Sequence, residues 1–145
     1  MEIQFKYAAI RTDQFASFDC PSDFSLQDCS LNGEVQTANN YDARSIMIKV
    51  VANIKCGDNL VLTLGVSSFF EIEESSWRSM IKDGFVIVPK DFLWHIGGLA
   101  VSTTRGILFA KTEATDLNRI ILPIIYMDQV ILSDMKIPVP EQCQK

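Results

Sequence analysis

Two long alternating segments joined by a short turn constrain the fold of this chain most strongly. In residues 44–55 and 60–72, apolar side chains recur at every second position. A period of two is typical of β-strands with two distinct faces. The residues between the two segments include Gly57 and Asn59, which readily adopt turn conformations. The pattern therefore predicts an antiparallel β-hairpin.

The segments around this hairpin predict an α+β fold. Alternation at residues 3–7 favours a first strand, and residues 31–37 favour a weaker second one. After a short helical stretch at 73–82, Pro89 marks the start of a long helix with an apolar stripe over 92–110. Pro123 precedes a short C-terminal helix ending near residue 132. We expect a four-stranded antiparallel sheet followed by a long helix and a short C-terminal helix.

The length of the chain, 145 residues, suits one domain, which we place at residues 1–138, with 139–145 as a flexible tail. A monomer of this size with a hydrophobic share of 48% leaves much apolar surface uncovered, so self-association is expected.

Charge and hydropathy exclude several classes of function. The net charge of −5 and the scattered basic residues argue against nucleic-acid binding. The first residues lack the basic and apolar regions of a signal peptide, and no apolar run is long enough for membrane insertion. We therefore expect a cytoplasmic protein.

No set of residues predicts an active site, a metal site or a bound cofactor. His95 is the only histidine, and Asp91 is its one candidate partner on a helical face. The acidic residues Glu71, Glu73 and Glu74 suit a solvated strand end better than a catalytic pair. We expect no enzymatic activity, and keep an enzyme using His95 as a minor hypothesis.

The four cysteines, Cys20, Cys29, Cys56 and Cys143, are widely spaced and form no CxxC pair. A reducing cytosol disfavours disulfides, so we expect unreactive, buried thiols.

More apolar side chains are present than one helix and one sheet need. Met47 and Val51 lie on the strand face opposite Ile48 and Val50, and residues 120–135 are rich in apolar side chains. One interpretation is core filling; the other is an assembly or binding surface.

In order and spacing, several motifs resemble those of the SecB export-chaperone family. They span Phe5 to about Leu132, and comprise the N-terminal Phe5-Lys6-Tyr7, the strand end Ser67-Ser68-Phe69-Phe70, the helix-opening Pro89, Thr104-Arg105-Gly106 and Leu122-Pro123-Ile124-Ile125-Tyr126.

The resemblance implies a chaperone that holds non-native polypeptides in apolar grooves and assembles as a homotetramer, a dimer of dimers. The groove residues implied are Phe69, Phe70, Leu93, Trp94, Ile124, Tyr126, Met127 and Val130, and an oligomer interface is placed at Met47, Lys49 and Val51. Classical members pass their clients to the SecA motor through acidic residues on the sheet. This chain has Thr63 where one such residue is expected.

Two binding functions follow from the resemblance. The first is a general holdase in protein export and translocation, with SecA as a possible partner. The second is a chaperone or adaptor dedicated to one client, for example in a toxin–antitoxin system.

Overall fold

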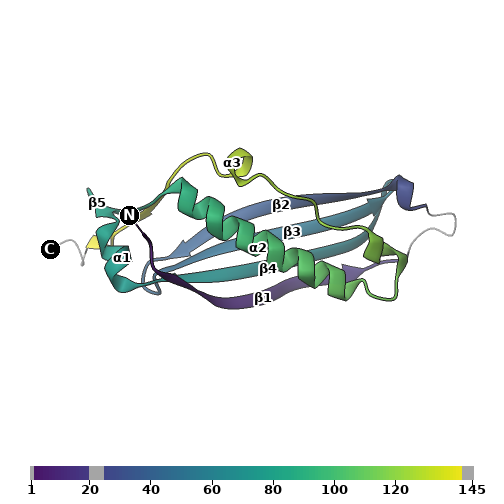
Figure 1. Ribbon diagram of the computed structural model, residues 1–145, viewed down its shortest axis with the longest axis horizontal. Helices are drawn as coiled ribbons and strands as arrows, with labels where there is room; N and C mark the ends of the chain where they lie inside the picture. Colours follow the sequence, from purple (N-terminus) through teal and green to yellow (C-terminus); the bar gives the residue numbers. More distant parts are fainter. Residues whose placement is uncertain (1, 20–24, 142–145) are drawn as a thin grey trace.

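A four-stranded antiparallel sheet forms the base of the molecule (Figure 1). The computed structural model describes residues 2–19 and 25–141. The strands lie in the order β1-β4-β3-β2, and their bounds are β1 Phe5–Ser17, β2 Cys29–Asn40, β3 Ser45–Cys56 and β4 Asn59–Ile72. With the helices that follow, this confirms the predicted α+β fold and the central β3–β4 hairpin.

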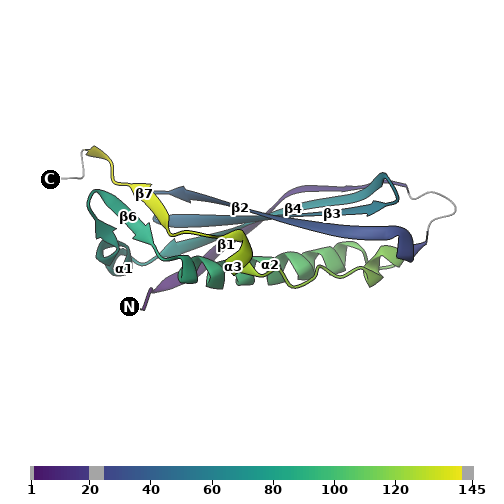
Figure 2. The same cartoon turned by 90° about the horizontal axis from the view of Figure 1, so that it is seen from above.

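The two faces of the sheet differ because of the alternation in β3 and β4. In the hairpin register, Ile48 lies opposite Ser68 and Val50 opposite Val66, and all four are fully buried on one face, here called the inner face. The residues between them point to the outer face, which no helix of the described residues covers (Figure 2). Apolar burial on the inner face is therefore the main source of stability for the sheet.

Strand β1 extends well beyond the segment predicted from sequence. Its pairing with β4 shifts register between Tyr7 and Ala9 and again between Thr12 and Gln14. These β-bulges leave Ala8 and Asp13 as extra residues and interrupt the two-residue period. Simple alternation fails as a guide there, although pairing continues to Ser17.

Helix α2, Lys90–Lys111, packs across the inner face as a second layer (Figure 2). Pro89 stands at its N-cap position, as the sequence predicts, and the Asp134 carboxylate accepts a hydrogen bond from the Lys90 backbone N–H (2.9 Å). The buried stripe of the helix consists of Leu93, Ile96, Gly97, Ala100, Val101, Thr104 and Leu108. No helix in the described part of the chain is both long and apolar enough to span a membrane.

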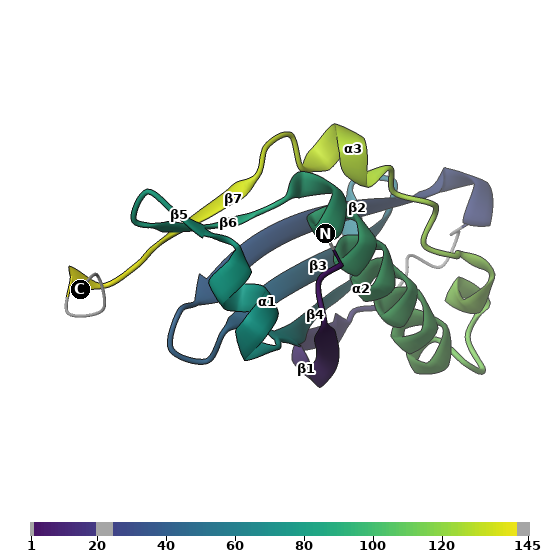
Figure 3. The same cartoon turned by 60° about the vertical axis from the view of Figure 1, so that its left-hand side comes forward.

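A second, three-stranded sheet was not predicted. It begins after the short helix α1, Glu74–Ser79 (Figure 3). Its strands lie in the order β5 (Ile81–Lys82), β6 (Phe85–Val88) and β7 (Met135–Pro138), and β7 comes from the C-terminal part of the chain. Beyond β7, Val139 is buried and donates a backbone hydrogen bond to the Gly84 carbonyl (3.0 Å). The predicted tail thus begins with an anchored residue, and 142–145 lie outside the described residues.

The prediction that all cysteines are unpaired thiols is wrong for two of them. Cys29 and Cys56 lie directly opposite each other in the β2–β3 register, with Cα atoms 4.0 Å apart, and form a disulfide. The pairing depends on the register of strands 27 residues apart, which spacing alone does not reveal. Cys20 and Cys143 lie outside the described residues.

Two leucines of β4 test the importance of the inner face. Leu64 is fully buried, whereas Leu60 is 39% exposed in the same strand. We predict that Leu64→Ala lowers the free energy of unfolding by about 2–5 kcal/mol, because it leaves a cavity in the core. Leu60→Ala is the matched control, with an expected loss below about 1 kcal/mol. Urea denaturation measures both, and equal losses would contradict the assigned faces.

Candidate functional site

An irregular segment between the 3₁₀ helix η2 (Asp116–Arg119) and β7, residues 120–134, is here called the strap. It runs alongside α2 and contains the one-turn helix α3, Met127–Val130 (Figure 1). Arg105 of α2 donates hydrogen bonds to the carbonyls of Leu122 (2.7 Å) and Pro123 (3.0 Å). Trp94 donates from its indole N–H to the Ile131 carbonyl (2.9 Å). These bonds satisfy strap carbonyls that have no regular secondary structure to pair with.

Two glycines allow the strap to approach the rest of the fold closely. A Cβ atom at Gly33 of β2 would lie 3.1 Å from the Ile125 Cδ1 atom, and one at Gly97 of α2 would lie 2.5 Å from the Met127 sulfur. The strap therefore rests on both the edge strand β2 and the long helix. Its position depends on residues far away in the sequence.

With its backbone fixed, the strap turns one set of apolar side chains inward and another outward. Leu122, Met127 and Ile131 are at most 9% exposed. A second set is 42–74% exposed and is here called the apolar ridge: Ile121, Ile124, Tyr126, Val130 and Leu132. Five large apolar side chains exposed within twelve residues of sequence are unusual on a protein surface and indicate a binding or assembly site.

The predicted groove residues divide between surface and core. Ile124, Tyr126 and Val130 belong to the ridge, and Trp94 is half-buried beside the strap. Phe69 is half-buried on the outer face of β4, away from the ridge. The other three, Phe70, Leu93 and Met127, are at most 7% exposed and fill the core, so their burial does not support a binding role in the single chain. The ridge residues Ile121 and Leu132 were not among the residues predicted from the sequence.

A hollow of about 270 Å³ lies between β2 and the C-terminal part of the strap. Val35 and Thr37 of β2 line one side, and residues 130–135 line the other. Ridge residues Val130 and Leu132 are part of this lining. The ridge thus borders a depression large enough to receive an apolar side chain.

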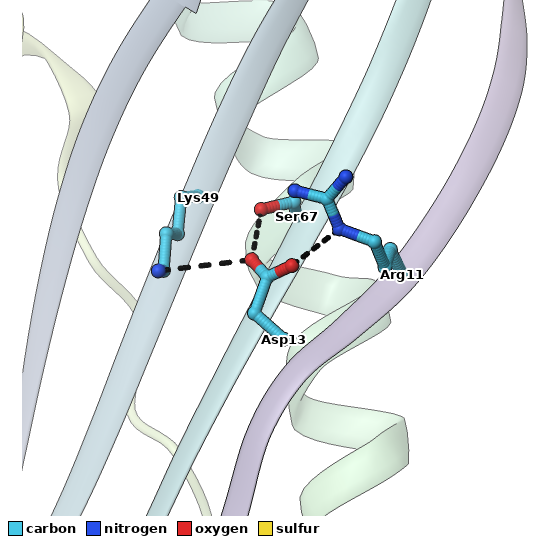
Figure 4. A network of polar contacts seen from close by, with 4 residues as sticks. All are labelled: Arg11, Asp13, Lys49 and Ser67. Atoms are coloured by element: carbon cyan, nitrogen blue, oxygen red, sulfur yellow. Dashed lines mark hydrogen bonds and ion pairs between the residues drawn. The ribbon is translucent and has the colours of Figure 1, made fainter.

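The outer face carries a polar network at its centre (Figure 4). The Asp13 carboxylate accepts hydrogen bonds from Ser67 and Arg11 and pairs with Lys49 (3.7 Å). The Ser67 hydrogen bond, followed by the Arg11 side chain, lowers the pKa of Asp13 below its ordinary value of 3.8. Asp13 is the extra residue of a β-bulge and lies on the same face as Arg11, two residues before it.

The predicted oligomer interface, Met47, Lys49 and Val51, lies on this same outer face, where all three side chains are half-buried. Lys49 is already engaged with Asp13. Thr63, at the position where the resemblance implies an acidic residue, donates a hydrogen bond to the Asn53 side chain (2.6 Å). The interface itself stays a prediction.

The contacts of the residues considered for catalysis are as follows. His95 is exposed, with its ring 6.0 Å from that of Phe5, and the Asp91 carboxylate accepts from the Phe92 backbone instead. Glu71 lies within 4 Å of Lys6 and Arg44, and Glu74 pairs with Arg78. Within residues 2–19 and 25–141, no three His, Cys, Asp or Glu side chains gather as a metal site would require.

Among solved structures, a SecB-like chaperone has a similar fold. The chain is similar to the SecB-like chaperone Rv1957 of Mycobacterium tuberculosis, solved in complex with a ChAD peptide from the antitoxin HigA1 (Rv1956). The TM-score is 0.50 and the identity 12%, over 83% of this chain and 90% of that one. A protein of unknown function from Streptococcus agalactiae aligns with a TM-score of 0.43 and 13% identity, over 87% and 100% of the two chains. No family model and no curated protein matches the sequence.

The Asp13 network predicts a pH dependence of stability. Because the folded state lowers the pKa of Asp13, its ionised form stabilises the fold above about pH 3.8, and this contribution is lost as the pH falls through the folded pKa. We predict that Asp13→Asn destabilises the protein at pH 7 and that the difference from wild type shrinks below pH 3.8. Denaturant unfolding across this pH range measures the difference in free energy of unfolding. The control is Asp58→Asn, a change at an exposed turn residue. A difference that is constant with pH would refute the role of the charge.

Proposed function

We propose that this chain is a holdase chaperone that binds non-native polypeptides through the apolar ridge of the strap. The observation that carries the proposal is the exposure of five large apolar side chains on a backbone held by Arg105 and Trp94. Such a surface is costly to expose to water and gains free energy when it covers the apolar segments of an unfolded chain. The SecB-like fold supports the same function.

The chemistry of the ridge suits loose recognition. Ile, Val and Leu offer contact area without fixed polar partners, and Tyr126 adds an aromatic face with a polar tip. Retention of a client would then come from many weak contacts acting together. The proposal includes no catalytic step and no cofactor, and places the protein in the cytoplasm.

The second candidate is a chaperone dedicated to one client. It is favoured by the similar Rv1957 chaperone, whose structure contains a peptide from an antitoxin. Transfer to SecA receives less support, because Thr63, Arg11 and Lys49 make the outer face mixed in charge rather than acidic. Co-purification from the native host separates these roles: one stoichiometric partner supports the dedicated chaperone, and many clients support the general holdase.

The ridge can be tested by removing its two most exposed residues, Ile124 (73%) and Leu132 (74%). We predict that the pair of changes Ile124→Ser and Leu132→Ser weakens binding of an unfolded protein by at least about tenfold, because each lost side chain removes apolar contact area. Light scattering of an aggregating substrate measures the effect. The control variant carries Leu60→Ser and Ile81→Ser, at exposed apolar positions away from the strap. Equal loss in both variants, or none, would count against the ridge.

We also propose that the chain forms a homo-oligomer, with a tetramer as the expected state. Besides the outer face, a second apolar surface is available where β1 lies beside α2. The Tyr7 hydroxyl donates to Thr103 (2.8 Å) there, and Ile10 and Leu99 are 53% and 36% exposed. This surface combines exposed apolar side chains with the unpaired edge of β1, both of which favour association with a second copy.

Light scattering tests the oligomer and its interface together. We expect a multiple of the 16.3 kDa chain mass. Ile10→Asp should lower that mass, because it places a charge in the β1–α2 surface. Ile81→Asp is the control and should not change it. If Met47→Asp lowers the mass instead, the interface lies on the outer face, and a monomeric wild-type protein would contradict the oligomer.

A further inference from the structure

The Cys29–Cys56 disulfide closes the open end of the β2–β3 hairpin. At the other end, the chain itself joins the two strands through the turn at residues 41–44. Strand β2 is the edge of the sheet, and within residues 2–19 and 25–141 its one partner strand is β3. Without the disulfide, the first residues of β2 are held by one row of backbone hydrogen bonds to β3 and by the packing of Leu31 against the core. Strand ends held by so few contacts open readily.

The part of β2 next to the disulfide supports the strap. Gly33, four residues after Cys29, lies under the side chains of Leu122 and Ile125. Farther along, Val35 and Thr37 line the hollow beside the ridge. Any loosening at the start of β2 therefore acts first on the surface beneath the strap.

We propose that Cys29 and Cys56 form a reversible dithiol–disulfide switch that sets how firmly β2, and with it the strap, is held. The part of this inference that concerns client affinity rests on the proposed function. The oxidised form holds β2 against β3 and presents the ridge on a rigid support. The reduced form lets the start of β2 separate from β3 and lowers the affinity for clients.

Exchange with glutathione supplies the chemistry. Cys29 is half-buried, whereas Cys56 is 4% exposed, so a glutathione thiolate reaches the Cys29 sulfur more easily. Attack there forms a mixed disulfide with Cys29 and releases Cys56 as a thiolate, which takes up a proton. A second glutathione thiolate then attacks the glutathione sulfur, giving oxidised glutathione and the Cys29 thiolate. Two electrons pass from two glutathione molecules to the protein disulfide, and oxidised glutathione reverses the sequence.

The experiment uses the full chain with Cys20→Ser and Cys143→Ser, so that only the two paired cysteines remain. Samples are equilibrated in buffers of varied ratio of reduced to oxidised glutathione, and the free thiols are counted by alkylation and mass spectrometry. Hydrogen exchange is then measured for residues 29–37, with α1 as an internal reference. Affinity is measured with a permanently unfolded probe, reduced and carboxymethylated α-lactalbumin. A Cys29→Ser, Cys56→Ser variant in the same background mimics the reduced state.

We expect the pair to change redox state within the millimolar glutathione range. Reduction should speed amide exchange in 29–37 by at least about tenfold, leave α1 unchanged and weaken probe binding severalfold. The double-serine variant should match the reduced protein in every buffer.

A pair that stays oxidised throughout, one that never oxidises, or exchange rates that do not depend on redox state would overturn the switch. Tight probe binding that is equal in both states would overturn its effect on clients. If the probe binds neither state, the proposed function fails, while the exchange rates still decide whether β2 is switched.

Discussion

The covering of the inner sheet face by a single helix is the constraint on which the rest of this structure depends. Strands β3 and β4 bury mostly aliphatic side chains there, and α2 provides most of the second layer. One helix is narrower than four strands, which leaves the flanks over β1 and β2 to be covered by something else. The strap covers the β2 flank, and the β1 flank retains exposed apolar side chains such as Ile10. The apolar ridge and the β1–α2 surface thus have the same origin, because one helix is too narrow to cover a four-stranded sheet.

The strap can expose large apolar side chains because its backbone is held by side chains rather than by secondary structure. Arg105 and Trp94 donate to its carbonyls, and Asp134 at its end caps α2. A regular helix in this place would turn its apolar stripe into the core. An irregular chain with fixed carbonyls can instead bury alternate side chains and leave large ones facing water. The apolar residues of 120–134 that exceed what the core can bury thereby form the exposed apolar ridge.

The elements that could be predicted from the sequence are those whose signals lie within a few neighbouring residues. The β3–β4 hairpin, the start of α2 and the fold class were evident because alternation and Pro89 are local signals. Strand β1 was underestimated because bulges break its period, and the small sheet was missed because its strands have two to four residues.

Within the site, the sequence identified the strap as unusually apolar but did not separate its inward from its outward side chains. Ile124 and Met127 look alike in a sequence, yet one is exposed and the other lies against Gly97 of α2. That distinction comes from long-range hydrogen bonds such as those that Arg105 donates to the strap carbonyls. No local sequence pattern marks such bonds. The cysteine pair was misjudged for the same reason, since only the strand register brings its members together.

The pairing of β7 with β6 has a consequence for the order of assembly during synthesis. Strand β6 leaves the ribosome about fifty residues before its partner β7, and Asp134, which caps α2, emerges just ahead of that strand. The strap, residues 120–134, rests on the β2 flank but follows all four strands of the large sheet and α2 in the sequence. The β2 flank can therefore be covered only after the large sheet and α2 have been synthesised, and the covering is made by the chain's own later segment.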